Sequence, residues 1–401
     1  MKEILVSQPE YVQNFRCIGS ACEDHCCKQW NITLDKPTYN KYLKSEIPGV
    51  KNIAVESIIK TKKSHSNWAL VKLNGEGNCS YLESDNLCKI HKTMGPEALS
   101  DTCSAYPRQY VLYKKERIES LSLSCPEATR KVLLNDTALN INNHSVAQTN
   151  FNARADISVE GKIINLFCAN LMMTNQNKVE HNLYAMACFL LYAEKLTGSL
   201  DHKFSSMEQV YTALAQQLSN GEISQSIAKI NGEPLLELAL FSGIHGAIQT
   251  NPHTRGRGTL YQYTERLNQH FVGTFTQLAL EENLSALKQS WDNIVLPWLK
   301  ERPYILRNYF QYRLYHDRFA IDKSVPILKQ FYLLVVDYFY VKSLLSAYAL
   351  EKGQIDEKTL VEVMYSYHSY RQHSDTTKAE FMAGIDSVKR NDDLSVLQLL
   401  V

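Results

Sequence analysis

Residues 17–27 read Cys-Ile-Gly-Ser-Ala-Cys-Glu-Asp-His-Cys-Cys, so four cysteines fall within eleven residues near the start of the chain. Thiols this close in sequence can converge only if the backbone loops around a common centre, which predicts a ligand loop. Cys26 and Cys27 are adjacent, and neighbouring side chains diverge in most backbone conformations. The alternative for this pair is one ligand and one small core residue, because free cysteine is among the most buried residue types.

A second group of cysteines follows at longer spacing, and it consists of Cys79, Cys88, Cys103 and Cys125. Such spacing excludes a self-contained zinc finger, whose paired ligands are usually two to four residues apart. The ligands must therefore come from several elements that fold together. His91 follows Cys88 by three residues, but a lone histidine is more often a surface or hydrogen-bonding residue than a ligand.

The distribution of cysteine along the chain indicates reduced thiols in the N-terminal third. Eight of the ten cysteines lie in the first 125 residues, and only Cys168 and Cys188 follow. Residues 1–10 show no basic region followed by an apolar one, so no export signal is visible. Clustered, reduced thiols favour zinc, copper(I) or iron–sulfur clusters, which select soft thiolate ligands. Cys168 and Cys188 lie on apolar faces of expected helices and are predicted to be ordinary core residues.

Spacing alone leaves the metal open. Eight thiols could form two tetrahedral zinc sites, or one [4Fe–4S] cluster with four cysteines to spare. The CxxxCxxC signature of radical S-adenosylmethionine (SAM) enzymes is absent, because Cys26 is followed at once by Cys27.

Composition bounds the class of protein. With 44% hydrophobic residues in 401, the chain has enough apolar surface for one or more cores. Its net charge of +1 argues against a nucleic-acid-binding protein, whose affinity rests on a positive field. Residues 331–350 reach membrane-spanning length but carry Asp337 and Lys342, which favours a buried helix over a transmembrane segment. Peripheral attachment to a membrane surface and assembly into homo-oligomers stay open.

The pattern along the chain predicts an α+β fold that is predominantly α-helical, with a small cysteine-rich metal-binding N-terminal module packed on a large helical domain. We expect a short strand at 30–34, a helix opening at 35–38, a β-hairpin of 109–113 and 117–124, and a helix from Pro126 to Leu134. The expected division is a module at 1–134, a linker at 135–154 and a helical substrate-binding domain at 155–401. Helices are expected at 163–174, 180–196, 206–218, 235–250, 261–279, 284–298, 304–319, 326–351, 358–373 and 377–390.

The cysteine framework resembles that of the flagellin lysine-N-methylases of enterobacteria. The resemblance is carried by residues 11–27 (YVQNFRCIGSACEDHCC), 79–82, 88–91 and the Cys-Ser-Ala-Tyr-Pro-Arg segment at 103–108, and it extends to RNYFQYRLY at 307–315. The N-terminal third is also similar to a wider family of small cysteine-rich domains that chelate zinc or iron.

The resemblance implies a cytoplasmic enzyme that transfers methyl groups from SAM to surface lysines of flagellin before export, with a [4Fe–4S] cluster. It leaves open which four cysteines bind the cluster. It implies that the ligands come from a set of eight: Cys17, Cys22, Cys26, Cys27, Cys79, Cys88, Cys103 and Cys125.

No sequence feature identifies the catalytic or SAM-binding residues. A convincing glycine-rich nucleotide loop is missing, so SAM is expected to bind outside an ordinary Rossmann domain. Tyrosines 304, 309, 312 and 315 could line a cation–π wall, although such aromatic stripes mostly pack in cores. The alternative function is a noncatalytic zinc- or iron-binding protein whose helical domain is a partner-binding surface.

Overall fold

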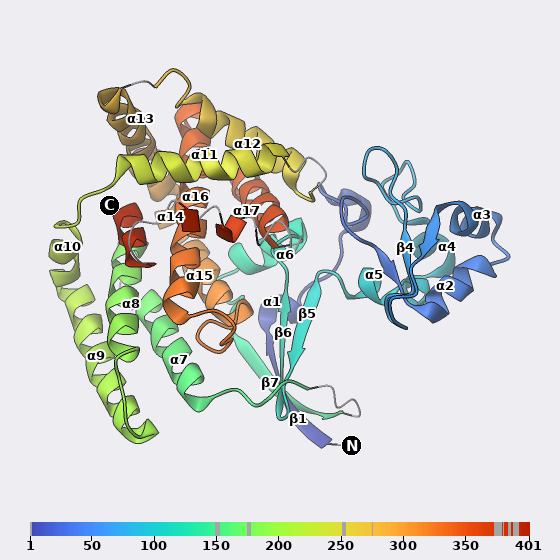
Figure 1. Cartoon of the computed structure of the whole chain (residues 1–401), viewed down its shortest axis with the longest axis horizontal. Coiled ribbons are helices and arrows are strands. Elements are labelled where there is room, and N and C mark those ends of the chain that lie inside the picture. The colour runs from blue at the N-terminus through green and yellow to red at the C-terminus, as the bar shows by residue number, and fades with distance from the viewer. Residues whose placement is uncertain are drawn as a thin grey trace.

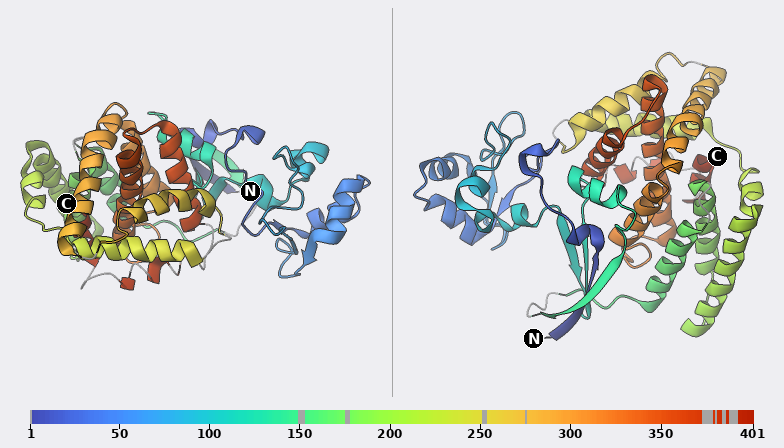
Figure 2. Two further views of the ribbon diagram at one scale, coloured as in Figure 1. Left: turned by 90° about the horizontal axis from the view of Figure 1, so that it is seen from above. Right: turned by 180° about the vertical axis from the view of Figure 1, so that it is seen from behind.

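The computed structural model describes residues 2–148, 153–174, 178–250, 254–274, 276–372, 379, 381–383, 386–387 and 393–401. Figure 1 shows three parts: a large helical body, a four-stranded sheet along one side of it, and a small lobe that projects beyond the sheet. Figure 2 shows the same projection from above and from behind. The fold is α+β and predominantly helical, as predicted.

The four-stranded sheet has the order β5-β6-β1-β7. Its strands are β1 (Lys2–Pro9), β5 (Arg108–Leu112), β6 (Glu116–Leu121) and β7 (Ile141–Gln148). Strand β1 runs parallel to β6 and antiparallel to β7. β5 and β6 form the predicted hairpin, with Val111 opposite Ile118. The segment expected to be a linker, 135–154, contains β7. Its polar sequence hid the strand, because an exposed edge strand needs no apolar alternation.

The small lobe has its own sheet, of order β2-β4-β3, and its own hydrophobic core. Ile32, Leu34 and Tyr42 are among the residues buried in that core. Asp35 begins the first helix by accepting a hydrogen bond from the Thr38 amide at 2.8 Å, as expected of an N-cap residue. The elements are β2 (Thr33–Leu34), α2 (Lys36–Leu43), α3 (Pro48–Ser57), β3 (Ile58–Lys60), β4 (Ala69–Val71), α4 (Lys89–Met94), η2 (Pro96–Ala98) and α5 (Asp101–Ala105).

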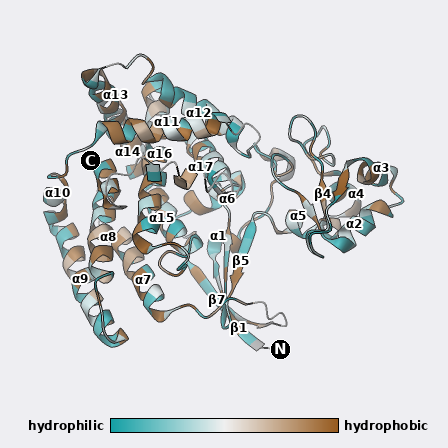
Figure 3. Ribbon diagram, in the orientation of Figure 1, coloured by the Kyte–Doolittle hydropathy of each residue, from teal (hydrophilic) through white to brown (hydrophobic). Residues whose placement is uncertain are grey.

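The helical body forms around a second, larger core. Figure 3 shows hydrophobic residues concentrated on body helices such as α8, whereas α2 of the small lobe is mainly hydrophilic. The body helices are α7 (Val159–Met173), α8 (Val179–Ala193), α9 (Leu200–Asn220), α10 (Glu222–Ile227), α11 (Pro234–Thr250), α12 (Arg257–Gln269), α13 (Gln277–Ser290), η3 (Trp291–Val295), α14 (Leu296–Lys300), α15 (Tyr304–His316), α16 (Ile327–Lys352), α17 (Glu357–Gln372) and η4 (Asp393–Leu400).

Two short N-terminal helices pack into the larger core and not into the small one. They are α1 (Glu10–Gln13), which buries Tyr11, and α6 (Pro126–Leu133), which buries Val132. Pro126 occupies the first turn of α6, as predicted. The two cores therefore divide the chain at other places than the expected module of residues 1–134: residues 32–98 supply the buried residues of the small core, while residues 11–15 and 121–138 join the body.

Helix α16 is the central helix of the body. By length and composition it could cross a membrane, but 78% of its most apolar window is buried inside the protein. Asp337 and Lys342 lie on this helix, and Asp337 is fully buried. The sequence-based interpretation of residues 331–350 as a buried helix is confirmed.

Two helical predictions differ from the structure. The helix expected at 261–279 ends at Gln269, and α13 begins at Gln277. Gly273 lies between them with a φ of +81°, a left-handed conformation that glycine adopts readily and that interrupts a helix. The helix expected at 284–298 contains a π-helical turn, η3. Most of the helix expected at 377–390 lies outside the described residues.

Candidate metal centre

The cysteine loop is attached to the small lobe by hydrogen bonds to backbone carbonyls, and one of these bonds joins the two cysteine groups. The Cys79 amide donates to the Cys27 carbonyl at 2.8 Å, and the Trp30 indole Nε1 donates to the Cys26 carbonyl at 2.6 Å. The Gln29 amide donates to the Gly77 carbonyl at 2.8 Å. These bonds place the loop after Cys22 against the segment that carries the second group.

One thiol, that of Cys27, interacts with a thiol from each of the two groups. The Cys27 thiol is hydrogen bonded to those of Cys26 and Cys88. The hydrogen bond with Cys27 lowers the pKa of Cys88 to about 6 and that of Cys26 to about 7, while the pKa of Cys27 itself is raised. Thiolate is the form that binds metal and reacts as a nucleophile. Because their pKa values are lowered, Cys26 and Cys88 are the thiols of this group that ionise most readily.

The other cysteines surround this contact in two sets. Cys79 and Cys103 interact electrostatically with Cys26 and Cys88, and burial raises their pKa values to about 12 and about 11. Cys22 interacts with Cys17 and Cys26, and its charge also acts on Cys125, where burial raises the pKa to about 12. Cys17 is exposed. Cys168 is fully buried in the body core, and Cys188 packs against the same core, as predicted.

Thiolates are the donors that a soft metal prefers, so the chemistry of the cysteines fits zinc or an iron–sulfur cluster. Among the described residues, no group of three or more histidine, cysteine or acidic side chains is arranged to hold a metal ion. Contact between the two cysteine groups is observed. Convergence of four sulfurs on one metal, and the choice of the eight cysteines as its ligands, stay predictions. His91, on α4, is exposed.

A row of side chains in contact connects the cysteine centre to the helical body. The Trp30 and Tyr106 rings lie 5.4 Å apart, and the Arg255 guanidinium lies 4.7 Å from the centre of the Tyr106 ring. Asp24, in the cysteine loop, forms an ion pair with Lys28 at 2.5 Å. Arg255 precedes α12, so a residue more than two hundred positions along the chain faces the cysteine loop.

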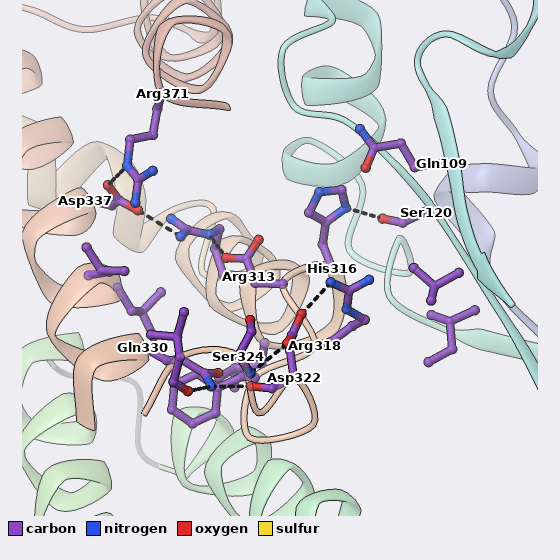
Figure 4. Close-up of a pocket in the computed structure, with 18 of the residues that line it drawn as sticks. Gln109, Ser120, Arg313, His316, Arg318, Asp322, Ser324, Gln330, Asp337 and Arg371 are labelled. Atoms are coloured by element: carbon purple, nitrogen blue, oxygen red, sulfur yellow. Dashed lines mark hydrogen bonds and ion pairs between the residues drawn. The ribbon is translucent and has the colours of Figure 1, made fainter. Parts of the chain in front are cut away.

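A cavity of about 360 Å³ lies between the hairpin and helices α15 to α17. Figure 4 shows the ion pairs on its wall, where Asp337 faces Arg313 and Arg371. Across the cavity, His316 Nδ1 lies 2.8 Å from the Ser120 hydroxyl. Burial lowers the pKa of His316 to about 4, so its imidazole is neutral at physiological pH. The volume is within the range of small-molecule sites.

The tyrosines of α15 support this region as packing residues. Tyr309 and Tyr312 are fully buried, and the Tyr312 hydroxyl donates to the Leu121 carbonyl at 2.7 Å. The Tyr315 hydroxyl donates to the Ser7 carbonyl at 3.0 Å. The interpretation of this stripe as core and interface aromatics is confirmed.

A second cavity, of about 1040 Å³, lies among α8, α10, α11, α13 and α16. Lys342 projects over the Trp291 ring, 5.3 Å from its centre, and pairs with Glu180 at 2.5 Å. Acidic side chains outnumber lysines on its lining, which includes Glu180, Glu233, Glu237, Glu281, Asp292, Lys178, Lys288 and Lys342. No cysteine lines either of these two cavities.

Comparison with known proteins identifies the family. The model of the FliB lysine N-methylase C-terminal domain matches residues 165–399. The chain is 35% identical over 401 residues to the lysine-N-methylases of Salmonella choleraesuis and Salmonella typhimurium, with complete coverage of both partners in each case. The chain belongs to the lysine N-methylase family. It is also 45% identical over 166 residues to the flagellar biosynthetic protein FliU of Salmonella muenchen, which covers 40% of this chain and 98% of that protein. No solved structure matches the chain.

Sequence reasoning missed Arg255 in this lysine N-methylase family member. The segment Thr-Arg-Gly-Arg-Gly at 254–258 resembles an exposed basic turn. The sequence shows only the glycine itself, and the structure shows that Gly256 has a φ of +77°. A Cβ there would lie 2.5 Å from Ser369 and 2.6 Å from the Ser366 carbonyl, so the turn packs tightly against α17. The turn therefore lies against α17, and its neighbour Arg255 is buried.

Glu237 lines the larger cavity, and its ionisation should make the stability of the folded protein depend on pH. Burial raises the pKa of Glu237 to about 7, against the opposing charges of Lys342 and Lys288. A raised pKa means that the folded state favours the protonated carboxyl, so stability falls as pH rises from about 4.5 through about 7. We expect Glu237→Gln to match the parent at about pH 4 and to be more stable by about 1–2 kcal/mol at about pH 8. Thermal unfolding at both pH values measures this, and equal differences at the two would contradict it.

Proposed function

We propose that this protein transfers methyl groups from SAM to the ε-amines of surface lysines on flagellin, and that the reaction depends on a [4Fe–4S] cluster at the cysteine centre. The observation that carries the proposal is the 35% identity to lysine-N-methylases over the whole length of both chains. The names of two further relatives, the flagellar biosynthetic proteins FliU and FliV, support flagellin as the substrate. Flagellin is made inside the cell, so we place the reaction in the cytoplasm before export.

The cysteine centre supports the cluster part of the proposal. The Cys27 thiol interacts with those of Cys26 and Cys88, and the lowered pKa values of Cys26 and Cys88 favour the thiolate that iron requires. Cys79 and Cys103 interact electrostatically with Cys26 and Cys88, so we propose them as further donors within the small lobe. A cluster bound there would supply iron and redox chemistry to the reaction. Zinc is the alternative metal, because the same thiolates would also bind zinc.

The helical body supports recognition of flagellin. The cavity of about 1040 Å³ is large for a small-molecule site, and its lining carries more carboxylates than lysines. An excess of negative charge in a partly closed site favours a cationic, lysine-bearing segment. We therefore assign substrate docking to residues 155–401 and metal chemistry to the cysteine-rich part. The net charge of +1 indicates that long-range steering contributes little, so binding should depend only modestly on ionic strength.

An anaerobic assay tests the proposed function. Iron-loaded protein is mixed with SAM and purified flagellin, and mass spectrometry of flagellin peptides measures added methyl groups. We expect methylated lysines only with SAM and iron-loaded protein, and a brown protein with broad absorbance at about 400 nm from thiolate-to-iron charge transfer.

Zinc-loaded protein is the control for the cluster. It should be colourless and should transfer no methyl groups. Equal rates with zinc and iron would show that the cluster is not required. Unmodified flagellin with fully iron-loaded protein would refute the activity itself.

A further inference from the structure

Arg255 is a buried cation at the junction of the small lobe and the helical body. Its side chain is only 1% exposed, and it sits between the cysteine loop, Tyr106 and the end of the β6–α6 connection. Its Nη2 donates to the Ser124 carbonyl at 3.4 Å and lies 3.6 Å from Asp24 Oδ2. Charged side chains are almost never fully buried unless they are paired, so this arginine calls for an explanation.

The contacts of Arg255 satisfy only part of its guanidinium. Within the part of the chain that the structure describes, the buried Nε and Nη1 atoms have no hydrogen-bond partner. A guanidinium has five N–H donors and no acceptor, so unpaired nitrogens in the interior carry the full cost of desolvation. The distance of 3.6 Å to Asp24 is long for a direct hydrogen bond, and Asp24 already pairs with Lys28.

The side chains around Arg255 indicate what kind of ligand its free N–H groups would bind. Arg255 and Lys28 place two positive charges beside Asp24 of the cysteine loop, and Asp24 balances one of them. The thiols of Cys26 and Cys125 lie close enough to Arg255 to interact with its charge. A buried positive charge with free donors, held against the cysteine centre, is complementary to an anion.

We propose that Nε and Nη1 of Arg255 bind an anionic group of whatever occupies the cysteine centre. This inference rests on the proposed function, which supplies two anions of suitable chemistry. One is the carboxylate on the methionyl part of SAM. The other is the thiolate-ligated iron–sulfur cluster, whose sulfur atoms accept hydrogen bonds. Either anion would bind to the same buried guanidinium. The two can be distinguished because substitution of Arg255 would change SAM binding in the first case and the bound cluster in the second.

Two substitutions and one matched control test this proposal in the full-length, anaerobically prepared protein. Arg255→Gln removes the charge, and Arg255→Lys keeps it with fewer and less rigid donors. Arg257→Gln is the control, because Arg257 also lies over a tyrosine ring, 4.3 Å from the centre of Tyr261, but its Nε is satisfied by the Ile248 carbonyl at 3.2 Å. Circular dichroism and thermal unfolding verify that each variant is folded. Should Arg255→Gln fail to fold, Arg255→Lys carries the same measurements.

The first readout is ligand binding by calorimetry, with SAM and decarboxylated SAM as probes. If Arg255 binds the carboxylate, the parent should prefer SAM by about 10- to 100-fold, the range of a charge-assisted hydrogen bond. Arg255→Gln should lose this preference and keep its iron. The second readout is iron per chain and the absorbance band. If Arg255 binds the cluster, Arg255→Gln should lose iron or shift the reduction potential, and the parent should bind both probes alike.

The outcomes separate this proposal from the proposed function. Unchanged iron, spectrum, reduction potential and probe preference in folded Arg255 variants would overturn it and leave Arg255 as a packing residue. A parent that binds neither iron nor SAM would overturn both. A parent that shows either Arg255 effect but leaves flagellin unmodified would refute only the methyl transfer to flagellin.

Discussion

Cys88→Ser is expected to remove most of the bound iron and to lower methyl transfer to flagellin by at least about 100-fold. Mutation of residues that only orient a metal's ligands already changes metal affinity or activity by about 10- to 100-fold, so loss of a ligand should cost at least as much. Cys88 is the thiol with the lowered pKa of about 6 and contacts Cys27 across the two cysteine groups. A hydroxyl stays protonated at neutral pH and is a poor replacement for thiolate. The same loss is expected for Cys26→Ser. Iron per chain, the absorbance band and mass spectrometry of flagellin measure the three effects.

Cys188→Ser is the matched control for these variants. Cys188 is half-buried on α8, packs against the body core and takes no part in the cysteine centre. Its substitution should leave iron content and methyl transfer within about twofold and cost at most about 1 kcal/mol of stability. Full iron content and full methyl transfer in Cys26→Ser and Cys88→Ser, tested singly and together, would show that the reaction does not require the cysteine centre.

Local sequence signals predicted the local structure of this chain well. Asp35 at the start of α2 and Pro126 in the first turn of α6 are capping signals that act within a few residues, and both helices begin where expected. The apolar period of residues 235–250 likewise gave α11 nearly to its ends. Such features depend on neighbours in sequence, so the sequence contains them directly.

The features that sequence reasoning missed depend on contacts between distant residues. Strand β7 pairs with β1 across more than 130 positions, and its polar face gave no pattern to recognise. Arg255 is buried because its turn meets both α17 and the cysteine loop, which lie at opposite ends of the chain. The skewed distribution of cysteine predicted a sulfur-rich centre, yet only the fold shows that Cys27 meets the second group, with its carbonyl at Cys79 and its thiol at Cys88.

The same limit applies to Asp337, which the sequence identified only as a charge inside an apolar helix. In the structure it is fully buried and paired with two arginines from other helices. Arg313 Nη2 donates to its Oδ2 at 2.8 Å, and Arg371 Nε donates to its Oδ1 at 3.2 Å. The Tyr367 hydroxyl donates to the same Oδ1 at 2.5 Å. Every described contact of the carboxylate is therefore with a donor, which explains how a charge is accommodated in the core.

Asp337→Asn is expected to destabilise the protein by about 3–5 kcal/mol, because removing one member of a buried ion pair leaves the others uncompensated. Burial alone would raise the pKa of Asp337, but Arg371 and Arg313 outweigh it and hold the pKa at about 2. Its contribution to stability is therefore complete above pH 3.8 and is lost as pH falls through about 2. Chemical denaturation of parent and variant at pH 7 measures the difference.

Asp322→Asn is the control, because Asp322 pairs with Arg318 at 2.8 Å on the more exposed wall of the same cavity. That pair should contribute at most about 1 kcal/mol. A cost for Asp337→Asn no greater than that of Asp322→Asn would show that the two arginines find other partners when the carboxylate is removed.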